Sequence, residues 1–243
     1  YCRSRSSRRR SCVPLRDDHA YVIAEAGSCH MGDYNAALRL IHAAADAGAE
    51  ACKFQLFKLE DILIDPSQGD PRTVLPPDWI HEVAAACKER EIDFLCTPFA
   101  PWAVKVLEPY VWAFKIGSFE WKRDDIWKSL GDKPTIASTG RGSKHVPDYK
   151  LYCVSKYPAP EEEIFLPEFG ANYDGFSDHT TSLIIPALAV ARGAWIIEKH
   201  LRLPETTSDC PDFPHSLDPE QFAEMVKNIR LAEAVCWRPQ PTS

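Results

Sequence analysis

The chain has 243 residues, of which 45% are hydrophobic and 26% charged, a balance typical of one α/β barrel domain or two smaller globular domains. No apolar run approaches the roughly 20 residues that span a bilayer, so the composition does not indicate a membrane protein. The net charge is −7, and residues 1–16 hold six Arg and no acid, so the rest is more acidic still and gives no reason to expect nucleic-acid binding.

Residues 1–18 are rich in Arg and Ser and have little apolar surface to bury, so we expect a disordered extension there. This segment lacks the apolar core of a secretory signal. A short tail is expected at residues 239–243. The nine cysteines mostly lie within apolar runs and form no CxxC pair, which favours free thiols in a reducing compartment, and hence a cytoplasmic protein.

From residue 20 onward, short β-rich runs alternate with helical patterns. In chain order we expect a strand at 20–27, a helix at 33–50, a strand at 51–57, a helix at 76–92, a strand at 92–99, a helix at 100–110, a strand at 112–120, a helix at 124–131, strands at 134–140, 149–155 and 173–180, a helix at 181–193, a strand at 194–201 and a helix at 218–235. Pro186 is expected to kink the helix that contains it.

Alternating strands and helices imply a parallel sheet with right-handed crossovers. Eight strands in a chain of this length predict a closed (β/α)8 TIM-type barrel over residues 19–238. One connection is irregular, because only RGSKHVPD separates the fifth strand from the sixth. That segment is too short for a helix of ordinary length, so we expect one outer helix to be missing after the fifth strand.

Polar side chains stand at the C-terminal end of strand after strand. They are Glu25; Lys53 and Gln55; Thr97; Lys115, Ser118 and Glu120; Ser138; Ser155 and Tyr157; Ser177, Asp178 and His179; and Glu198 and His200. In a barrel these ends converge on one face, where barrel active sites are built. A ring of polar groups rich in Lys, Glu and His is hard to explain as packing, so we expect an active site there.

The motifs at these strand ends resemble those of the N-acetylneuraminate (sialic acid) synthase family. In order they are AEAGSCHMGD, KFQLF, CTPF, FKIGSFE, IASTGR, YPAP, GFSDHT, IIEKHL and CPDFPHSLDP, spread over roughly residues 20–235. The resemblance implies an enzyme that condenses phosphoenolpyruvate with an N-acyl hexosamine, usually N-acetylmannosamine, and releases phosphate. It further implies a divalent metal, Mn²⁺ with Mg²⁺ or Co²⁺ as alternatives, and a homodimer. We expect the family's C-terminal antifreeze-like domain to be absent.

The resemblance also implies residue roles. The metal ligands would be His179 and His200. Cations and hydroxyls would hold phosphoenolpyruvate: Lys53, Thr97, Lys115, Ser118, Ser138, Ser155 and Ser177. The catalytic groups would be Glu25, Glu120, Lys53 and Lys115. Sugar contacts would come from Gln55, Tyr157, Glu198 and Asp212. Structural alternatives stay open, because either catalytic carboxylate could simply pair with a lysine and Tyr157 could be a packed aromatic residue.

Several residues depart from the family pattern. Cys29 stands at an Asn position and Phe119 at a Gly position, while Tyr152, Val154 and Ser155 replace polar residues. The bulky Phe119 ring is expected to narrow the site.

Other functions therefore remain open from the sequence. They are a synthase for legionaminic or pseudaminic acid precursors, a sugar-binding barrel without turnover, an aldolase using Lys53 or Lys115 as a Schiff base, and a softer metal held by Cys29 and His30.

Overall fold

The computed structural model describes residues 18–139 and 145–237. The predicted disordered extension at residues 1–18, apart from Asp18, and the predicted tail at residues 239–243 lie outside the described residues.

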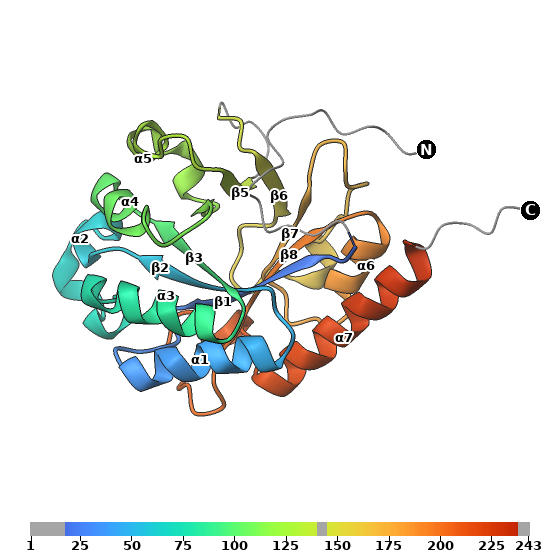
Figure 1. The fold of residues 1–243 in the computed structure, drawn as a ribbon, viewed down its shortest axis with the longest axis horizontal. Helices are drawn as coiled ribbons and strands as arrows, with labels where there is room; N and C mark the ends of the chain where they lie inside the picture. The colour runs from blue at the N-terminus through green and yellow to red at the C-terminus, as the bar shows by residue number, and fades with distance from the viewer. Residues whose placement is uncertain (1–17, 140–144, 238–243) are drawn as a thin grey trace, which may run out of the picture.

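Eight parallel strands form one sheet that curls into a nearly closed barrel (Figure 1). The strands are β1 (Tyr21–Gly27), β2 (Ala51–Leu56), β3 (Asp93–Pro98), β4 (Phe114–Ile116), β5 (Thr135–Thr139), β6 (Tyr149–Cys153), β7 (Gly175–Asp178) and β8 (Ile196–His200). Hydrogen bonds join them in the order β3-β2-β1-β8-β7-β6-β5-β4, and the two end strands of this order, β3 and β4, are neighbours in space. The predicted (β/α)8 barrel is confirmed.

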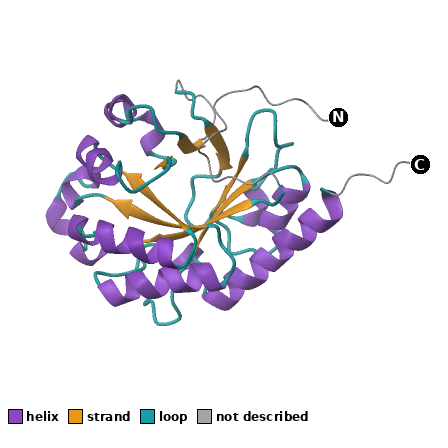
Figure 2. Ribbon diagram, viewed as in Figure 1, coloured by secondary structure: helices purple, strands orange, loops and turns teal. Residues whose placement is uncertain are grey.

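Helices follow most of the strands and pack around the barrel (Figure 2). They are α1 (Tyr34–Asp46), α2 (Leu59–Ile62), α3 (Ile80–Glu89), α4 (Pro101–Leu107), α5 (Asp124–Ser129), α6 (Ile185–Ala191) and α7 (Pro219–Cys236). Asp33 caps α1, and Asp218 and Gln221 form a capping box at the start of α7. The predicted kink at Pro186 is wrong: α6 begins only at Ile185, so the proline occupies the first helical turn, where its missing N–H costs nothing.

The expected gap in the outer ring is present among the described residues. Residues 145–148, which precede β6, contain no helix, and the long connection from β6 to β7 contains only a 3₁₀ turn, Glu161–Glu163. Side chains of this connection, Ile164, Leu166 and Phe169, pack against the core instead. The connection therefore supplies apolar cover that a helix provides elsewhere in the ring.

The barrel interior is divided along its axis. Its N-terminal part is an apolar cluster: Tyr21, Ile23, Ala51, Leu95, Ala113, Ile136, Leu151 and Ile196. Successive side chains of a strand alternate between faces, so the residues two and four positions beyond Ile196, Glu198 and His200, also point into the barrel. The apolar cluster thus fills the barrel beneath the polar strand ends. Burying each large aliphatic side chain of this cluster is worth about 1.5–3 kcal/mol.

Among the described residues, no helix is long and apolar enough to cross a membrane.

Candidate active site

A cavity of about 310 Å³ opens at the C-terminal ends of the barrel strands. Its lining comprises Glu25, Lys53, Gln55, Thr97, Phe99, Lys115, Gly117, Ser118, Phe119, Glu120, Ser138, Tyr157, Ser177, His179, Glu198, His200, Pro211, Asp212 and His215. Every site residue expected from the sequence is in this set except Ser155. Ser155 is exposed just beyond β6, with its hydroxyl 3.9 Å from the Cys153 sulfur.

Two lysines and two carboxylates form a buried network at the bottom of the cavity. Lys53 Nζ lies 2.6 Å from Glu25 Oε2 and 3.7 Å from Glu198 Oε2. Lys115 Nζ lies 3.2 Å from Glu198 Oε1. Register places these groups together, because Glu25 of β1 pairs with Lys53 of β2 and with His200 of β8. We call Glu25, Lys53, Lys115 and Glu198 the charged floor.

Hydroxyl and amide groups complete the hydrogen bonds of the charged floor. Lys53 donates to Thr97 Oγ1 over 3.1 Å, and Lys115 donates to Ser138 Oγ over 2.8 Å. Ser177 Oγ donates to Glu198 Oε1 over 2.7 Å, and Gln55 Nε2 donates to Glu25 Oε1 over 2.7 Å. Glu198 and Gln55, expected as sugar contacts, therefore already have partners in the floor.

The two floor carboxylates have opposite pKa shifts. Burial raises the pKa of Glu25 to about 7, although Lys53 opposes the shift. Burial acts on Glu198 in the same direction, but Lys115 and Lys53 together hold its pKa below the usual range. Near neutral pH, Glu198 is therefore the permanent counter-ion of the lysines, and Glu25 is the carboxyl group that can hold or release a proton.

Two glycines leave room for carboxylates at the cavity wall. A Cβ on Gly27, which has a φ of +49°, would meet Asp212 Oδ2 at 2.3 Å. A Cβ on Gly117 would meet Glu120 Oε2 at 2.2 Å. Burial raises the pKa of Glu120. Glu120 therefore reaches the cavity from the short 3₁₀ turn after β4, and its position depends on the absence of a side chain at Gly117.

Three potential metal ligands converge beside the charged floor. One ligand atom from each of His200, Asp212 and His215 lies within 4.8 Å of the others. His215 is buried. Its Nε2 lies 3.4 Å from Asp212 Oδ1, and His200 Nδ1 lies 3.8 Å from the same oxygen, but neither contact has the geometry of a hydrogen bond. Burial also lowers the pKa of His200, so its imidazole is neutral near pH 7. Buried imidazoles that lack a hydrogen bond and face a shared carboxylate fit a bound cation. We call these three residues the His/Asp group.

His179 lies next to the His/Asp group, with its ring centroid 5.6 Å from that of His200. Its Nδ1 is 3.2 Å from the carbonyl oxygen of Val154. In a neutral ring this contact makes Nδ1 the donor and leaves the lone pair on Nε2. Burial lowers the pKa of His179 to about 4, so the ring is neutral at physiological pH.

The sequence reasoning missed His215. It lies in a 3₁₀ turn (Phe213–His215) of the loop after β8, so the strand-end pattern that revealed His200 does not mark it. The available signal was the CPDFPHSLDP motif, which yielded Asp212 only. Asp212 itself is fixed by Ser28, whose backbone N–H and hydroxyl each donate to Asp212 Oδ2 over 2.8 Å.

Two exposed aromatic residues of the lining, Phe119 and Tyr157, form an aromatic rim. Phe119 is 65% exposed and Tyr157 40% exposed, and their rings lie 6.0 Å apart. The Tyr157 hydroxyl is 2.8 Å from Ser118 Oγ, and its ring lies 4.2 Å from that of His179. The narrowing of the site expected from Phe119 is therefore at the mouth of the cavity. The charged floor stays open.

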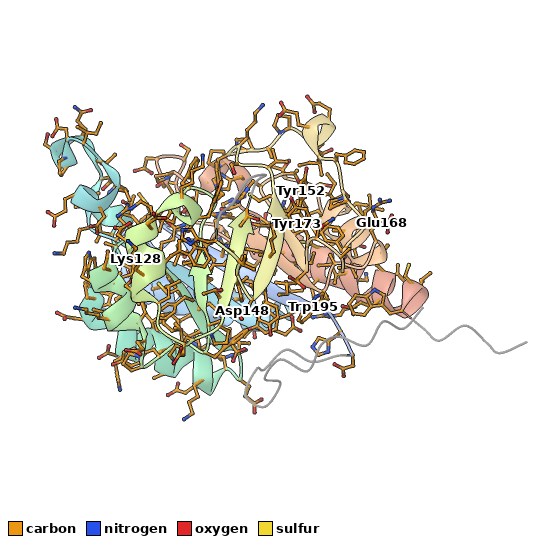
Figure 3. The ribbon with its side chains drawn as sticks, turned by 90° about the horizontal axis from the view of Figure 1, so that it is seen from above. Lys128, Asp148, Tyr152, Glu168, Tyr173 and Trp195 are labelled. Atoms are coloured by element: carbon orange, nitrogen blue, oxygen red, sulfur yellow. The ribbon has the colours of Figure 1, made fainter. Side chains whose placement is uncertain are left out.

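Tyr152, another departure from the family pattern, does not line the cavity. It packs against Tyr173, with ring centroids 5.5 Å apart, and against Phe176. Tyr152 and Tyr173 are both labelled in Figure 3. The alternative of a softer metal at Cys29 and His30 gains no support, because the His/Asp group is the one convergence of three ligands within residues 18–139 and 145–237.

Comparison with known proteins agrees with this geometry. The model of the NeuB family matches residues 40–238. The chain is 32% identical to the N,N'-diacetyllegionaminic acid synthase of Campylobacter jejuni over 86% of this chain and 75% of that protein. It is 29% identical to the human N-acetylneuraminate-9-phosphate synthase over 90% of this chain and 72% of that protein. The crystal structure of a Leptospira borgpetersenii N-acetylneuraminic acid (sialic acid) synthetase in complex with citrate superposes with a TM-score of 0.81 at 28% identity, covering 93% of this chain and 87% of that one. The sequence resemblance is confirmed, and this chain belongs to the NeuB family.

Proposed function

We propose that this protein condenses phosphoenolpyruvate with the aldehyde of an N-acyl hexosamine to form a nonulosonic acid and phosphate. The observation that carries the proposal is the charged floor lying directly beside the His/Asp group in one cavity. One part of this cavity suits a small multiply charged anion, and the other suits a polarised carbonyl.

Phosphoenolpyruvate would bind at the charged floor. When Glu25 carries its proton, Lys53 and Lys115 face only one ionised carboxylate, Glu198, so the floor has a net positive charge. Thr97 and Ser138, which accept from the two lysines, fix the direction of the ammonium groups. Ser118 and Ser177 would add hydroxyl contacts to the bound anion, as the family resemblance implies.

In the proposed reaction, C3 of phosphoenolpyruvate forms a bond to the aldehyde carbon, and water then adds to the cationic C2 before phosphate leaves. The aldehyde oxygen gains a proton and the attacking water loses one. Glu25, with a pKa of about 7, suits either transfer, and the buried Glu120 would orient the water or stabilise positive charge at C2.

The residues of the His/Asp group fit the divalent metal that the resemblance implies, because His215 and His200 present buried nitrogens without a hydrogen bond next to the Asp212 carboxylate. His200, Asp212 and His215 would hold the ion, with His179 beside them. A bound ion would polarise the aldehyde carbonyl as a Lewis acid. Two imidazoles and one carboxylate suit Mn²⁺ or Co²⁺ better than Mg²⁺, which prefers oxygen ligands.

The aromatic rim supports an acceptor with apolar substituents. A legionaminic or pseudaminic acid precursor, with two acylamino groups, would offer more apolar surface to Phe119 and Tyr157 than N-acetylmannosamine does. The 32% identity to a protein named N,N'-diacetyllegionaminic acid synthase favours the same acceptor class. We therefore propose it as the second candidate substrate.

The test is phosphate release from phosphoenolpyruvate with each acceptor, with and without Mn²⁺, for the wild type and Lys115→Met. We expect release that requires both acceptor and metal, and a loss of about two orders of magnitude or more in the variant because a buried cation is removed from the anion site. Lys105→Met, at an exposed position of α4, is the matched control and should keep full activity.

Phosphoenolpyruvate binding without release, for every acceptor tried, would instead favour the sugar-binding barrel without turnover. Covalent trapping by borohydride with either substrate would favour the Schiff-base alternative.

A further inference from the structure

Two cysteines from distant parts of the chain meet beside the cavity. Cys210 Sγ lies 3.6 Å from Cys29 Sγ, although the residues are 181 positions apart in the sequence. Their side chains are 2% and 1% exposed for Cys29 and Cys210 respectively. Cys29 also occupies the position where the family motif has Asn. Nothing in the proposed reaction uses either thiol.

The surroundings of the two sulfurs are polar. Ser28 Oγ lies 3.6 Å from Cys210 Sγ, and Ser216 Oγ lies 3.8 Å from Cys29 Sγ. Both serines also bind Asp212: Ser28 donates to its carboxylate, and Ser216 donates to its carbonyl oxygen over 2.6 Å. The thiol pair therefore lies in the layer that joins the loop after β1 to the loop after β8.

We propose that Cys29 and Cys210 are a redox modification site, which a peroxide converts into a disulfide that ties these two loops together. The sulfurs must approach by about 1.5 Å to reach the S–S bond length of about 2.05 Å. The adjoining segment, residues 204–209, is largely exposed, and its ion pairs, Arg72–Asp209 and Arg39–Glu205, are at the surface, so little buried packing opposes such a shift.

The chemistry balances with hydrogen peroxide as the oxidant. The Cys210 sulfur attacks one peroxide oxygen, the O–O bond breaks, and the departing hydroxide takes up the thiol proton as water, leaving a sulfenic acid on Cys210. The Cys29 sulfur then attacks the Cys210 sulfur, an S–S bond forms, and the sulfenic oxygen leaves as a second water with the Cys29 proton. Two electrons pass from the thiols to the peroxide.

The experiment uses the full chain with three cysteines replaced by Ser: the exposed Cys236, and Cys2 and Cys12, which lie outside the described residues. The buried cysteines then remain as the reactive thiols. Peroxide-treated protein is alkylated, digested with trypsin without reductant, and mapped by mass spectrometry. We expect peptide 17–39 joined to peptide 203–227, with a combined mass lower by two hydrogens, and its loss on treatment with dithiothreitol. Cys29→Ser and Cys210→Ser are matched controls, and each should abolish the link.

The rate of cross-linking tests whether Cys29 and Cys210 are neighbours in the folded protein. The cross-link should form at least tenfold faster in folded protein than in urea-unfolded protein, and the oxidised protein should have a Tm no lower than the reduced one. Cross-linking that is faster in urea, a lowered Tm, or a link between other cysteines would overturn the proposal. None of these readouts depends on the proposed catalytic activity.

Discussion

Glu25 is the residue at which burial and charge compete most directly. Its side chain is almost fully buried, yet it lies within 2.6 Å of Lys53. Burial outweighs this contact and raises its pKa from 4.5 to about 7, and the negative charge of Glu198, which also contacts Lys53, adds to the rise. The charged floor therefore keeps one carboxyl group that can change protonation state near neutral pH.

This shift predicts a pH-dependent stability that Glu25→Gln removes. Since the folded-state pKa of about 7 exceeds the unfolded value of about 4.5, the folded state binds the proton more tightly, and the free energy of unfolding falls as pH rises between these values. The shift corresponds to about 3 kcal/mol. In urea unfolding, the free energy of unfolding of the wild type should therefore fall between pH 5 and pH 8. The part of this fall that comes from Glu25 should be missing in Glu25→Gln.

Glu108→Gln is the control for that measurement, because Glu108 is exposed at the end of α4. It should retain the pH dependence of the wild type. An unchanged slope in Glu25→Gln would show that another group binds the proton.

At the rim, Phe119→Ala is expected to change acceptor use without changing the fold. The ring is 65% exposed, so its removal should leave the free energy of unfolding within about 0.5 kcal/mol of the wild type. Loss of an aromatic contact worth about 0.5–1.5 kcal/mol should raise the KM for a diacylated acceptor several-fold, with the KM for phosphoenolpyruvate unchanged. Phe165→Ala, 80% exposed and outside the cavity lining, is the matched control. An equal rise in both KM values would place the ring nearer the charged floor.

At the scale of elements, a buried ion pair joins the outer faces of β7 and β8. Lys199 Nζ lies 2.6 Å from Asp178 Oδ2, both side chains are fully buried, and Lys199 also donates to the carbonyl oxygen of Thr180. Because side chains alternate along strands, His179 and His200 follow these residues on the inner face. The pair thus holds the two strand ends that carry the predicted metal ligands.

Lys199→Met is expected to destabilise the protein by about 3–5 kcal/mol, because it leaves Asp178 buried without its cation. Adding Asp178→Leu should recover much of this loss, since an apolar pair of similar volume does not require desolvation of a charge. Denaturant unfolding of the two single variants and the double variant gives the coupling energy directly. A double variant as unstable as the sum of the single ones would show that the ion pair contributes nothing of its own.

The accuracy of the sequence predictions also varies by element. Buried strands such as β8 were recognisable because a parallel strand covered on both faces is a continuous apolar run. The strand expected at 112–120 shrinks to β4 (Phe114–Ile116), since a 3₁₀ turn follows Gly117, and this moves Ser118 and Glu120 into a loop. Most polar strand ends predicted the cavity lining, except Ser155, which is exposed, and Asp178, which points outward. His215, on a loop, had no periodic pattern to reveal it.

At the scale of the whole molecule, the barrel interior changes character along its axis, from the apolar cluster through the charged floor to the His/Asp group and the aromatic rim. On β1 the change takes place within two residues, because Ile23 belongs to the apolar cluster and Glu25 lines the cavity. The charges thereby lie against a buried apolar cluster, whose low dielectric strengthens their interactions. A ligand that bridges β8 and the loop after β8 would bind to the folded barrel only.

Binding of a divalent ion to the His/Asp group should therefore stabilise the entire fold. At a concentration of about 100 times Kd, a ligand specific for the folded state adds about 2.7 kcal/mol, or roughly 5–10 °C in Tm for a domain of this size. We expect thermal unfolding to show this increase with Mn²⁺ or Co²⁺, a smaller one with Mg²⁺, and reversal by a chelator. His215→Ala should reduce the increase strongly, whereas His42→Ala, on α1 and outside the cavity lining, should retain it.

Absorption of bound Co²⁺ gives an independent readout, because loss of an imidazole ligand alters its visible spectrum. An unchanged spectrum and Tm response in His215→Ala would assign the ion to His179 and His200 without His215, as the sequence resemblance alone implies.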